Sequence, residues 1–208
     1  MVDTLTTGAA GTAESKPLYL GKFELREVTA PTGMVVSKEA HAVELTYAGQ
    51  EVEVTETAAS ITNQRQKVAV SLEKALEQNE LFGIGMNGEI TAVTFGLYAA
   101  EKLTAADGMV IPADGLIEIV SINEKGQGAV STDLPIGSYY LKEQATDNHY
   151  VLSDEKYPIV FDGTSQDTAL VEIKANNGST IGNNLIYGDI HGLKKDDDRP
   201  PLDWALLG

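Results

Sequence analysis

The stretch Gly137-Ser138-Tyr139-Tyr140-Leu141-Lys142-Glu143 decides the fold that we expect for this chain. Successive side chains of a β-strand point to opposite faces, so Tyr139 and Leu141 share one face with Glu143. An isolated buried carboxylate is costly, and Glu143 therefore needs either solvent or a dedicated partner. The stretch predicts a half-buried strand whose apolar stripe ends in a carboxylate.

The same arrangement occurs a second time, earlier in the chain. In Gly21-Lys22-Phe23-Glu24-Leu25-Arg26-Glu27, the side chains of Phe23 and Leu25 share a face with Glu27. The two glutamates lie 143 − 27 = 116 residues apart. Because the pattern recurs, chance is a poor explanation for a glutamate at the end of an apolar stripe.

A lysine and an asparagine extend this repeat. Asn63 lies eleven residues before Lys74, and Asn184 lies eleven residues before Lys195. The two lysines are 195 − 74 = 121 residues apart, so one unit has about 120 residues, an ordinary domain size. We expect residues 1–66 to be the C-terminal half of one unit, residues 67–188 to be a complete unit, and residues 189–208 to begin a third.

Short segments of alternating polarity predict an all-β fold. Apolar and polar residues alternate over 43–47 and 52–54, and further strands are expected at 61–63, 67–74, 90–95, 94–98, 116–122, 128–131, 138–143, 157–161 and 169–173. Turn signals rich in Gly and Asp separate these segments. Many short strands at this spacing indicate an antiparallel β-sandwich or a partly open barrel.

Two segments have a competing interpretation. Residues 72–78 are good helix formers, so a helix competes there with the strand that we predict over 67–74. Gly83-Ile84-Gly85-Met86-Asn87-Gly88 matches the Gly-x-Gly-x-x-Gly pattern of dinucleotide-binding proteins. That pattern holds a pyrophosphate only where a helix follows, whereas residues 90–95 alternate as in a strand. We therefore interpret the glycine-rich stretch as a turn.

Charge and composition narrow the class of protein. The chain has 31 acidic and 15 basic residues, and its net charge of −16 opposes binding to nucleic acid or to anionic lipid. It has no cysteine, which excludes disulfides, thiolate metal sites and cysteine nucleophiles. No apolar run has the length of a membrane helix, and Met1-Val2-Asp3-Thr4 lacks the features of a signal peptide. We expect no nucleic-acid partner and no membrane insertion in this segment, with any targeting signals outside it.

Metal sites and hydrolase motifs find little support. His41, His149 and His191 have no metal-like spacing, and no Gly-x-Ser-x-Gly motif is present. Residues 196–198 are three aspartates, but Arg199-Pro200-Pro201 follows them where a calcium loop needs further ligands and a glycine. We predict no metal site and interpret the aspartates as solvated charge.

These residues together resemble the SpaA-like, or Cna B-type, domains of Gram-positive surface proteins and pilins. The resemblance covers residues 17–208 and rests on the two glutamate strands, on Thr94-Phe95-Gly96-Leu97-Tyr98, on Lys74 and on the late asparagines. It implies an Ig-like β-sandwich, present as tandem repeats. In each complete repeat a first-strand lysine and a last-strand asparagine form a spontaneous isopeptide bond, promoted by a buried glutamate. One departure is that residues 144–149 replace the usual proline-containing turn after the second glutamate strand.

The resemblance assigns a role to each residue of the complete unit. Burial disfavours the charged form of a lysine, so the amine of Lys74 becomes a nucleophile. Glu143 acts as the catalytic residue: it polarises the side-chain carbonyl of Asn184 and carries protons while the amine attacks and ammonia leaves. Asn183 is the alternative to Asn184, because face alternation does not decide between them and only the eleven-residue register selects Asn184. No cofactor is required.

The incomplete units contain parts of the same set. Glu27 is the corresponding catalytic residue of the first unit, and Asn63 and Lys195 are unpaired cross-link candidates. One hypothesis is that residues around Lys195 of one copy complete the half-domain of another copy, beside Asn63 and Glu27.

The functional prediction is a stalk or spacer module of an extracellular, cell-wall-associated protein or pilin of a Gram-positive bacterium. Its partners are neighbouring repeats of the same surface protein, and its single-turnover cross-link does not make it an enzyme. The alternative is an adhesin module that binds a host protein or glycan through loops 99–115 or 145–156, where His149 and Tyr150 are the aromatic candidates.

Overall fold

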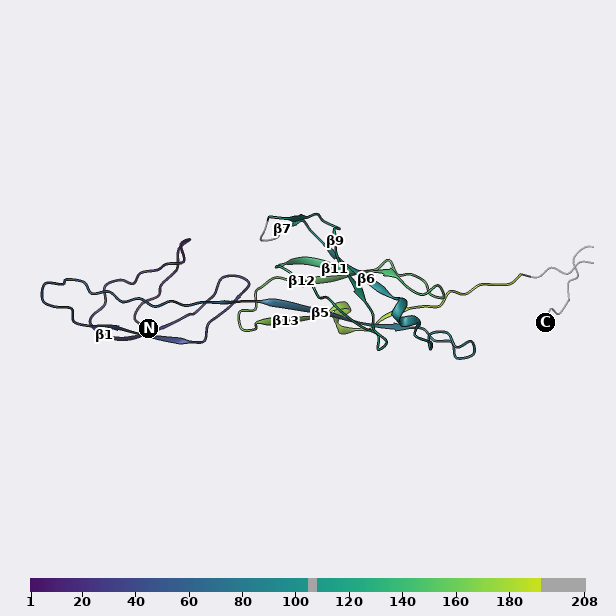
Figure 1. The fold of residues 1–208 in the computed structure, drawn as a ribbon, viewed down its shortest axis with the longest axis horizontal. Coiled ribbons are helices and arrows are strands. Elements are labelled where there is room, and N and C mark those ends of the chain that lie inside the picture. Colours follow the sequence, from purple (N-terminus) through teal and green to yellow (C-terminus); the bar gives the residue numbers. More distant parts are fainter. Residues whose placement is uncertain (105–107, 192–208) are drawn as a thin grey trace, which may run out of the picture. The chain divides into compact units, whose positions relative to one another are not determined.

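The computed structural model describes residues 1–104 and 108–191, and the regular secondary structure of this part of the chain is almost entirely β-strand (Figure 1). The all-β class expected from the sequence is confirmed. The chain forms two compact units. Unit 1 comprises residues 1–68, 133–136 and 161–171, and unit 2 comprises residues 69–132, 137–160 and 172 onward. The division into repeats at residues 66 and 188 stays a prediction.

Unit 1 contains four short strands before residue 67, namely β1 (Gly21–Arg26), β2 (Met34–Val35), β3 (Ala40–Leu45) and β4 (Gln64–Arg65). β1 pairs antiparallel with β3, and β2 pairs antiparallel with β4. The turn at residues 30–36 is held by the backbone of residues 163–166: Gly33 N donates to Gly163 O at 3.2 Å, and Val36 N donates to Gln166 O at 2.9 Å. Among residues 1–68, Ala30 is the one apolar residue that is fully buried.

The rest of the described chain supplies two larger sheets and two short 3₁₀ helices. The elements are β5 (Lys67–Leu76), η1 (Glu89–Ala92), β6 (Thr94–Ala99), β7 (Leu103–Thr104), β8 (Val110–Ile111), β9 (Leu116–Ser121), β10 (Gln127–Ala129), β11 (Gly137–Ala145), β12 (Lys156–Phe161), β13 (Leu170–Lys174), η2 (Ala175–Gly178) and β14 (Ile181–Asn183). One sheet has the order β10-β5-β13 with β14 beside β5, and the other has the order β12-β11-β6-β9. β7 and β8 form a separate antiparallel pair.

The core of unit 2 lies between these two sheets. Leu72 of β5 and Val120 of β9 approach so closely that a Cβ added at Gly128 would lie 3.0 Å from one and 3.2 Å from the other. The buried apolar residues of the core include Val70, Leu72, Phe95, Leu97, Val120, Tyr139, Leu141 and Ile159. Full burial of each such side chain contributes about 1.5–3 kcal/mol, so this layer dominates the stability of unit 2.

The alternating burial of β5 confirms the strand interpretation of residues 67–74 over the helical one. Val70, Leu72 and Lys74 are buried, and the residues between them are exposed. The glycine-rich turn is also confirmed, since Gly83, Gly85 and Gly88 have positive φ angles of 65°, 82° and 87°.

Three expected strands are absent. Val52 and Val54 lie in no strand and are 47% and 69% exposed, because no neighbouring strand pairs with that segment. Residues 61–63 are not a strand either. Residues 89–92 form η1 instead of an extended segment, because the Glu89 carboxylate accepts hydrogen bonds from Gly85 N at 3.1 Å and Asn87 N at 2.7 Å and so holds the chain in a turn.

One pairing departs from an antiparallel sandwich and positions the site. β14 runs parallel to β5, with Ile181 opposite Lys74 and Asn183 opposite Leu76. The first and last strands of unit 2 are therefore neighbours.

Among the described residues, no helix has both the length and the apolar character needed to cross a membrane.

Candidate functional site

Glu143 ends the apolar stripe of β11 inside the sandwich. Tyr139 and Leu141 on the same face are 1% and 0% exposed, and Glu143 itself is 1% exposed. One carboxylate oxygen, Oε2, accepts hydrogen bonds from Ser153 N at 2.9 Å and from Asn183 Nδ2 at 2.7 Å. The other oxygen, Oε1, has no hydrogen-bond partner among the described residues and lies 3.7 Å from Lys74 Nζ.

Lys74 approaches this carboxylate from β5. The Lys74 side chain has no exposed surface, and its Nζ donates hydrogen bonds to Ala75 O and Ile181 O, each at 3.2 Å. Burial lowers the pKa of Lys74 from its ordinary value of 10.5, although the Glu143 carboxylate opposes this shift. The amine is thus held in an environment that favours its neutral, nucleophilic form.

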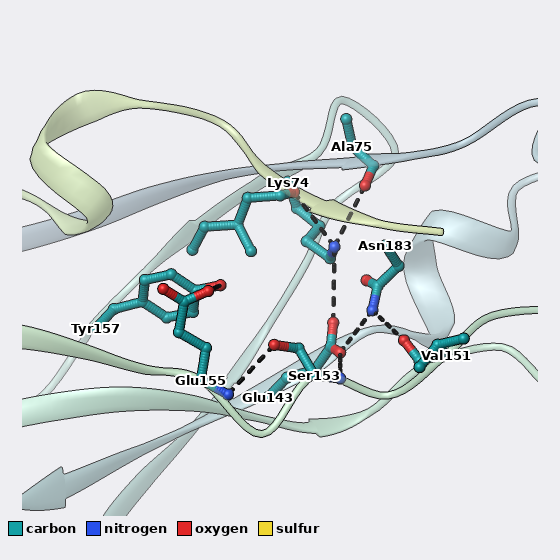
Figure 2. A network of polar contacts seen from close by, with 9 residues as sticks. Lys74, Ala75, Glu143, Val151, Ser153, Glu155, Tyr157 and Asn183 are labelled. Atoms are coloured by element: carbon teal, nitrogen blue, oxygen red, sulfur yellow. Dashed lines mark hydrogen bonds and ion pairs between the residues drawn. The ribbon is translucent and has the colours of Figure 1, made fainter. Parts of the chain in front are cut away.

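Asn183 reaches the same carboxylate from β14. Its side-chain Nδ2 donates to Glu143 Oε2 and also to Val151 O, both at 2.7 Å. Its Oδ1 is buried and has no hydrogen-bond partner among the described residues. Figure 2 shows the Lys74 amine and the Asn183 amide both directed at the carboxylate of Glu143. Three strands therefore bring an amine, an amide and a carboxylate together.

The expected position of Asn184 needs correction, since the structure places this residue outside the cluster. Asn184 is exposed, whereas Ile181 and Asn183 share the buried face of β14. Its backbone carbonyl accepts a hydrogen bond from Val151 N at 3.0 Å. The eleven-residue spacing measures distance along the chain, but the pairing of β14 with β5 decides which side chain points inward. Asn183, the alternative kept open by the sequence, occupies the position beside Glu143.

Glu27 and Asn63, the expected counterparts in the first unit, also lie together. Asn63 Nδ2 donates to Glu27 Oε2 at 2.5 Å. Lys195 and the aspartates at 196–198 lie outside the described residues. In the part of the chain that the structure covers, no group of three or more His, Asp or Glu residues is placed to hold a metal ion.

Sequence reasoning missed the backbone groups that complete the site. Val151 O, Ser153 N and Ile181 O form hydrogen bonds with Asn183, Glu143 and Lys74, respectively. These are main-chain groups, so no residue type marks them in the sequence. The segment between β11 and β12 supplies two of these groups, Val151 O and Ser153 N.

The aromatic candidates for ligand binding differ in exposure. Tyr150 is 3% exposed, and its hydroxyl donates to Glu77 O at 2.9 Å, so it forms part of the interior. His149 is exposed and contacts Asp147, with 2.6 Å between His149 Nδ1 and Asp147 Oδ1. Burial of Tyr150 removes one of the two residues on which the adhesin alternative rests.

A family model agrees with this fold. The SpaA prealbumin-like fold domain matches residues 1–59 and 85–179, which is more than half of the chain. The chain belongs to this family. None of the curated proteins matches its sequence.

Several solved structures of bacterial proteins show similarity to this chain. The Bacillus anthracis TIE protein is 18% identical, with a TM-score of 0.56 over 88% of this chain, which spans 28% of that protein. A C-terminal fragment of the pilus adhesin SpaC from Lactobacillus rhamnosus GG is 14% identical, with a TM-score of 0.43, and the match covers 86% of this chain and 81% of that one.

A third similar structure is the Corynebacterium diphtheriae major pilin SpaA, which is 18% identical with a TM-score of 0.37, over 70% of this chain and 38% of that one. The structure of that pilin is described as pointing to a modular pilus assembly with stabilising isopeptide bonds. At 18% identity, the match to the Bacillus anthracis TIE protein supports the fold alone.

Proposed function

We propose that unit 2 is a structural module of a Gram-positive surface protein or pilin, cross-linked by an isopeptide bond between Lys74 and Asn183. One observation carries the proposal: Lys74, Glu143 and Asn183 converge from β5, β11 and β14 in an otherwise apolar interior. The membership of the chain in the family of SpaA prealbumin-like fold domains supports the structural role.

A purely structural ion pair explains the cluster less well. Taking two charges out of water costs several kcal/mol per ion, and the pair repays this cost only if the remaining polar atoms are satisfied. Here Glu143 Oε1 and Asn183 Oδ1 are both buried without a hydrogen-bond partner among the described residues. A reaction between the amine and the amide replaces the Lys74 amine with a neutral amide. It thereby removes the free-energy cost of burying a charge on Lys74.

The chemistry is an amide transfer within the protein. The neutral Nζ of Lys74 attacks Cγ of Asn183, and Glu143 takes a proton from Nζ and delivers it to Nδ2. The bond between Cγ and Nδ2 then breaks, and ammonia leaves. The product is an amide between Nζ and Cγ, and the carboxylate is regenerated. No electrons are transferred and no cofactor takes part.

Folding supplies the orientation that this slow reaction needs. Glu143 Oε2 and Val151 O hold the Asn183 amide, while Ala75 O and Ile181 O hold the Lys74 amine. Well-oriented intramolecular reactions reach effective molarities of about 10⁵ M or more. The reaction happens once per chain, so the protein is not a turnover enzyme.

The cross-link joins the first strand of unit 2 to its last strand. Because β5 and β14 are parallel neighbours, tension that enters through one and leaves through the other passes through the covalent bond. This is the property of a load-bearing repeat in a cell-wall-associated stalk, whose partners are the neighbouring repeats of the same protein.

Intact mass and peptide mapping of the freshly folded chain test the proposal. We expect a mass lower than that of the sequence by one ammonia, and one branched peptide joining Lys74 to Asn183. Asn183→Ala should abolish the loss, while the matched variant Asn184→Ala should retain it. An unmodified mass, or a loss that depends on Asn184 instead, would overturn the assignment.

A further inference from the structure

A groove lies on the outer face of the sheet that contains β5, on the side away from Lys74. Side chains of β5 alternate, so Glu73 is exposed while Leu72 and Lys74 are buried. Gln127 of β10 pairs with Glu73, which places both side chains on the same outer face. We call this feature the outer groove, and its lining includes Ser71, Glu73, Asn123, Gln127, Lys174 and Gly178. Its volume is about 360 Å³, and small-molecule sites have volumes of about 300–1,000 Å³.

The turn between β9 and β10 forms one wall of the outer groove and is held by its own hydrogen bonds. Asn123 Oδ1 accepts from Lys125 N at 2.9 Å and from Gln127 N at 3.0 Å. Asn123 N donates to Gln127 O, and Gly126 N donates to Asn123 O, both at 2.9 Å. These contacts occupy the side-chain oxygen of Asn123, so its Nδ2 is the donor that it can offer to a ligand.

The 3₁₀ helix η2 forms the opposite wall and has a strained backbone. Asn176 and Asn177 have φ angles of 52° and 53°, and Gly178 has a φ of 79°. Left-handed backbone is unfavourable for residues with a Cβ, even though asparagine tolerates it better than most. Ser179 N donates to Asn176 O at 2.9 Å, and Asn176 Nδ2 donates to Ser179 O at 3.3 Å, which holds this conformation in place. Strain of this kind is concentrated at binding sites and other functional sites.

Glu73 and Lys174 supply opposite charges that do not pair with each other. Both side chains are exposed and line the outer groove, and neither forms an ion pair or a side-chain hydrogen bond with another described residue. The methylene groups of Lys174 run beside the strained wall, since a Cβ added at Gly178 would lie 3.7 Å from Lys174 Cδ. The outer groove therefore presents one negative and one positive group to the same ligand.

The composition of the lining narrows the class of ligand. Among the residues that line the outer groove there is no aromatic side chain on which a sugar ring could stack. One lysine beside a carboxylate disfavours an anionic ligand such as a phosphate, because the carboxylate repels it. Ser71, Asn123 and Gln127 supply hydroxyl and amide groups, which match the hydrogen-bonding groups of a peptide backbone.

We propose that the outer groove binds a short zwitterionic peptide. The peptide ammonium pairs with Glu73, its carboxylate pairs with Lys174, and its amide groups form hydrogen bonds with Asn123 and Gln127. An exposed ion pair contributes little by itself, so the two fixed walls, which lose little freedom on binding, are an essential part of the site. The site does not depend on the cross-link, because Glu73 and Lys74 point to opposite faces of β5.

The test is a titration of the full ¹⁵N-labelled chain with trialanine that has free termini, followed by NMR. We expect saturable shifts of the backbone amides of Ser71, Gln127 and Gly178. Trialanine with an acetylated N-terminus and an amidated C-terminus should cause much smaller shifts, because it has neither charge. The Asn183→Ala chain, which cannot cross-link, should bind trialanine as the unaltered chain does. Loss of binding in that variant would contradict a site that is independent of the proposed cross-link.

Charge variants test the two ion pairs separately. Glu73→Gln and Lys174→Met should each weaken the binding of trialanine by about two- to fivefold, the value of one exposed ion pair. Glu172→Gln, which removes an exposed carboxylate of β13 outside the lining, is the matched control and should leave the affinity unchanged. The inference is overturned by the absence of saturable shifts, by equal binding of the blocked peptide, or by unchanged affinity in both groove variants.

Discussion

The side-chain amine of Lys74 lies in the buried interior, where the charged form of an amine is destabilised. Its side chain has no exposed surface, and burial lowers the pKa of Lys74 from 10.5, while the Glu143 carboxylate opposes the shift. Because the folded pKa lies below the unfolded one, the unfolded chain binds more protons in that pH range. The free energy of unfolding therefore increases as the pH rises toward 10.5, and this contribution of Lys74 is absent at lower pH.

The first prediction tests this linkage in a chain that cannot cross-link. We expect the free energy of unfolding of Asn183→Ala to rise with pH more steeply than that of Lys74→Met with Asn183→Ala, as the pH approaches 10.5. Urea unfolding at a series of pH values measures both slopes. Both variants contain the same tyrosines and the same other lysines, so the difference between their slopes reports Lys74 alone. Equal slopes would show that Lys74 has an ordinary pKa.

The second prediction concerns Glu143 as the proton carrier. Glu143→Ala should slow the loss of ammonia during refolding by about 10²–10⁴-fold, the usual contribution of general acid–base catalysis. Intact mass recorded over the course of refolding gives the rate. Glu172→Ala, which removes an exposed glutamate of β13, is the control and should react normally. A Glu143→Ala chain that reacts as fast as the control would remove Glu143 from the mechanism.

At the scale of elements, the turn between β9 and β10 contacts β5 at Lys74 and fixes the position of this residue along the sheet. Lys74 N donates to Gly126 O at 2.7 Å. Gly126 has a φ of +76°, which favours glycine, and a Cβ at this position would overlap the carbonyl oxygen of Lys74. The close approach of these two backbones holds Lys74 in register with β14.

The third prediction follows from this contact. Gly126→Ala should destabilise unit 2 by about 1–3 kcal/mol, because the backbone must either strain or move away from Lys74. Chemical unfolding in the Asn183→Ala background measures the change without the cross-link. Gly182→Ala is the matched control, since a Cβ there meets nothing within 4 Å, and its effect should be much smaller. Similar losses for both variants would contradict the proposed role of the turn.

At the scale of the whole molecule, the proposed cross-link would close unit 2 into a loop. A bond from Lys74 to Asn183 encloses about 110 residues, and the chain-entropy model for a cross-link of that size gives about 4–5 kcal/mol of stabilisation. The gain comes from the unfolded state, because the closed loop has fewer conformations to lose on folding.

The fourth prediction is mechanical and thermal. Asn183→Ala should be less stable than Asn184→Ala by about 4–5 kcal/mol. Under tension, unfolding of unit 2 should release a further length of about 360–400 Å in Asn183→Ala, corresponding to about 110 extended residues. Single-molecule pulling and thermal melting of the two variants make the comparison. The same extension in both would show that no bond closes the loop.

The sequence by itself determined the features that depend on local pattern. Period-two alternation placed Lys74 and Glu143 on buried faces of β5 and β11, because a strand that packs on one side must bury every second side chain. The repeat of the glutamate strand likewise predicts Glu27 and Asn63 as parts of one set, and the two side chains are hydrogen-bonded in the structure. The all-β class followed from the same alternation.

Only the tertiary structure decided which asparagine faces Glu143. Asn183 and Asn184 are equivalent in residue type and differ by one position, and the register of β14 against β5 turns one inward and the other outward. The exposure of Val52 and Val54 was settled in the same way, since an alternating segment becomes a strand only where another strand offers it hydrogen bonds. Pairing between distant segments is a property of the folded chain, and local pattern does not encode it.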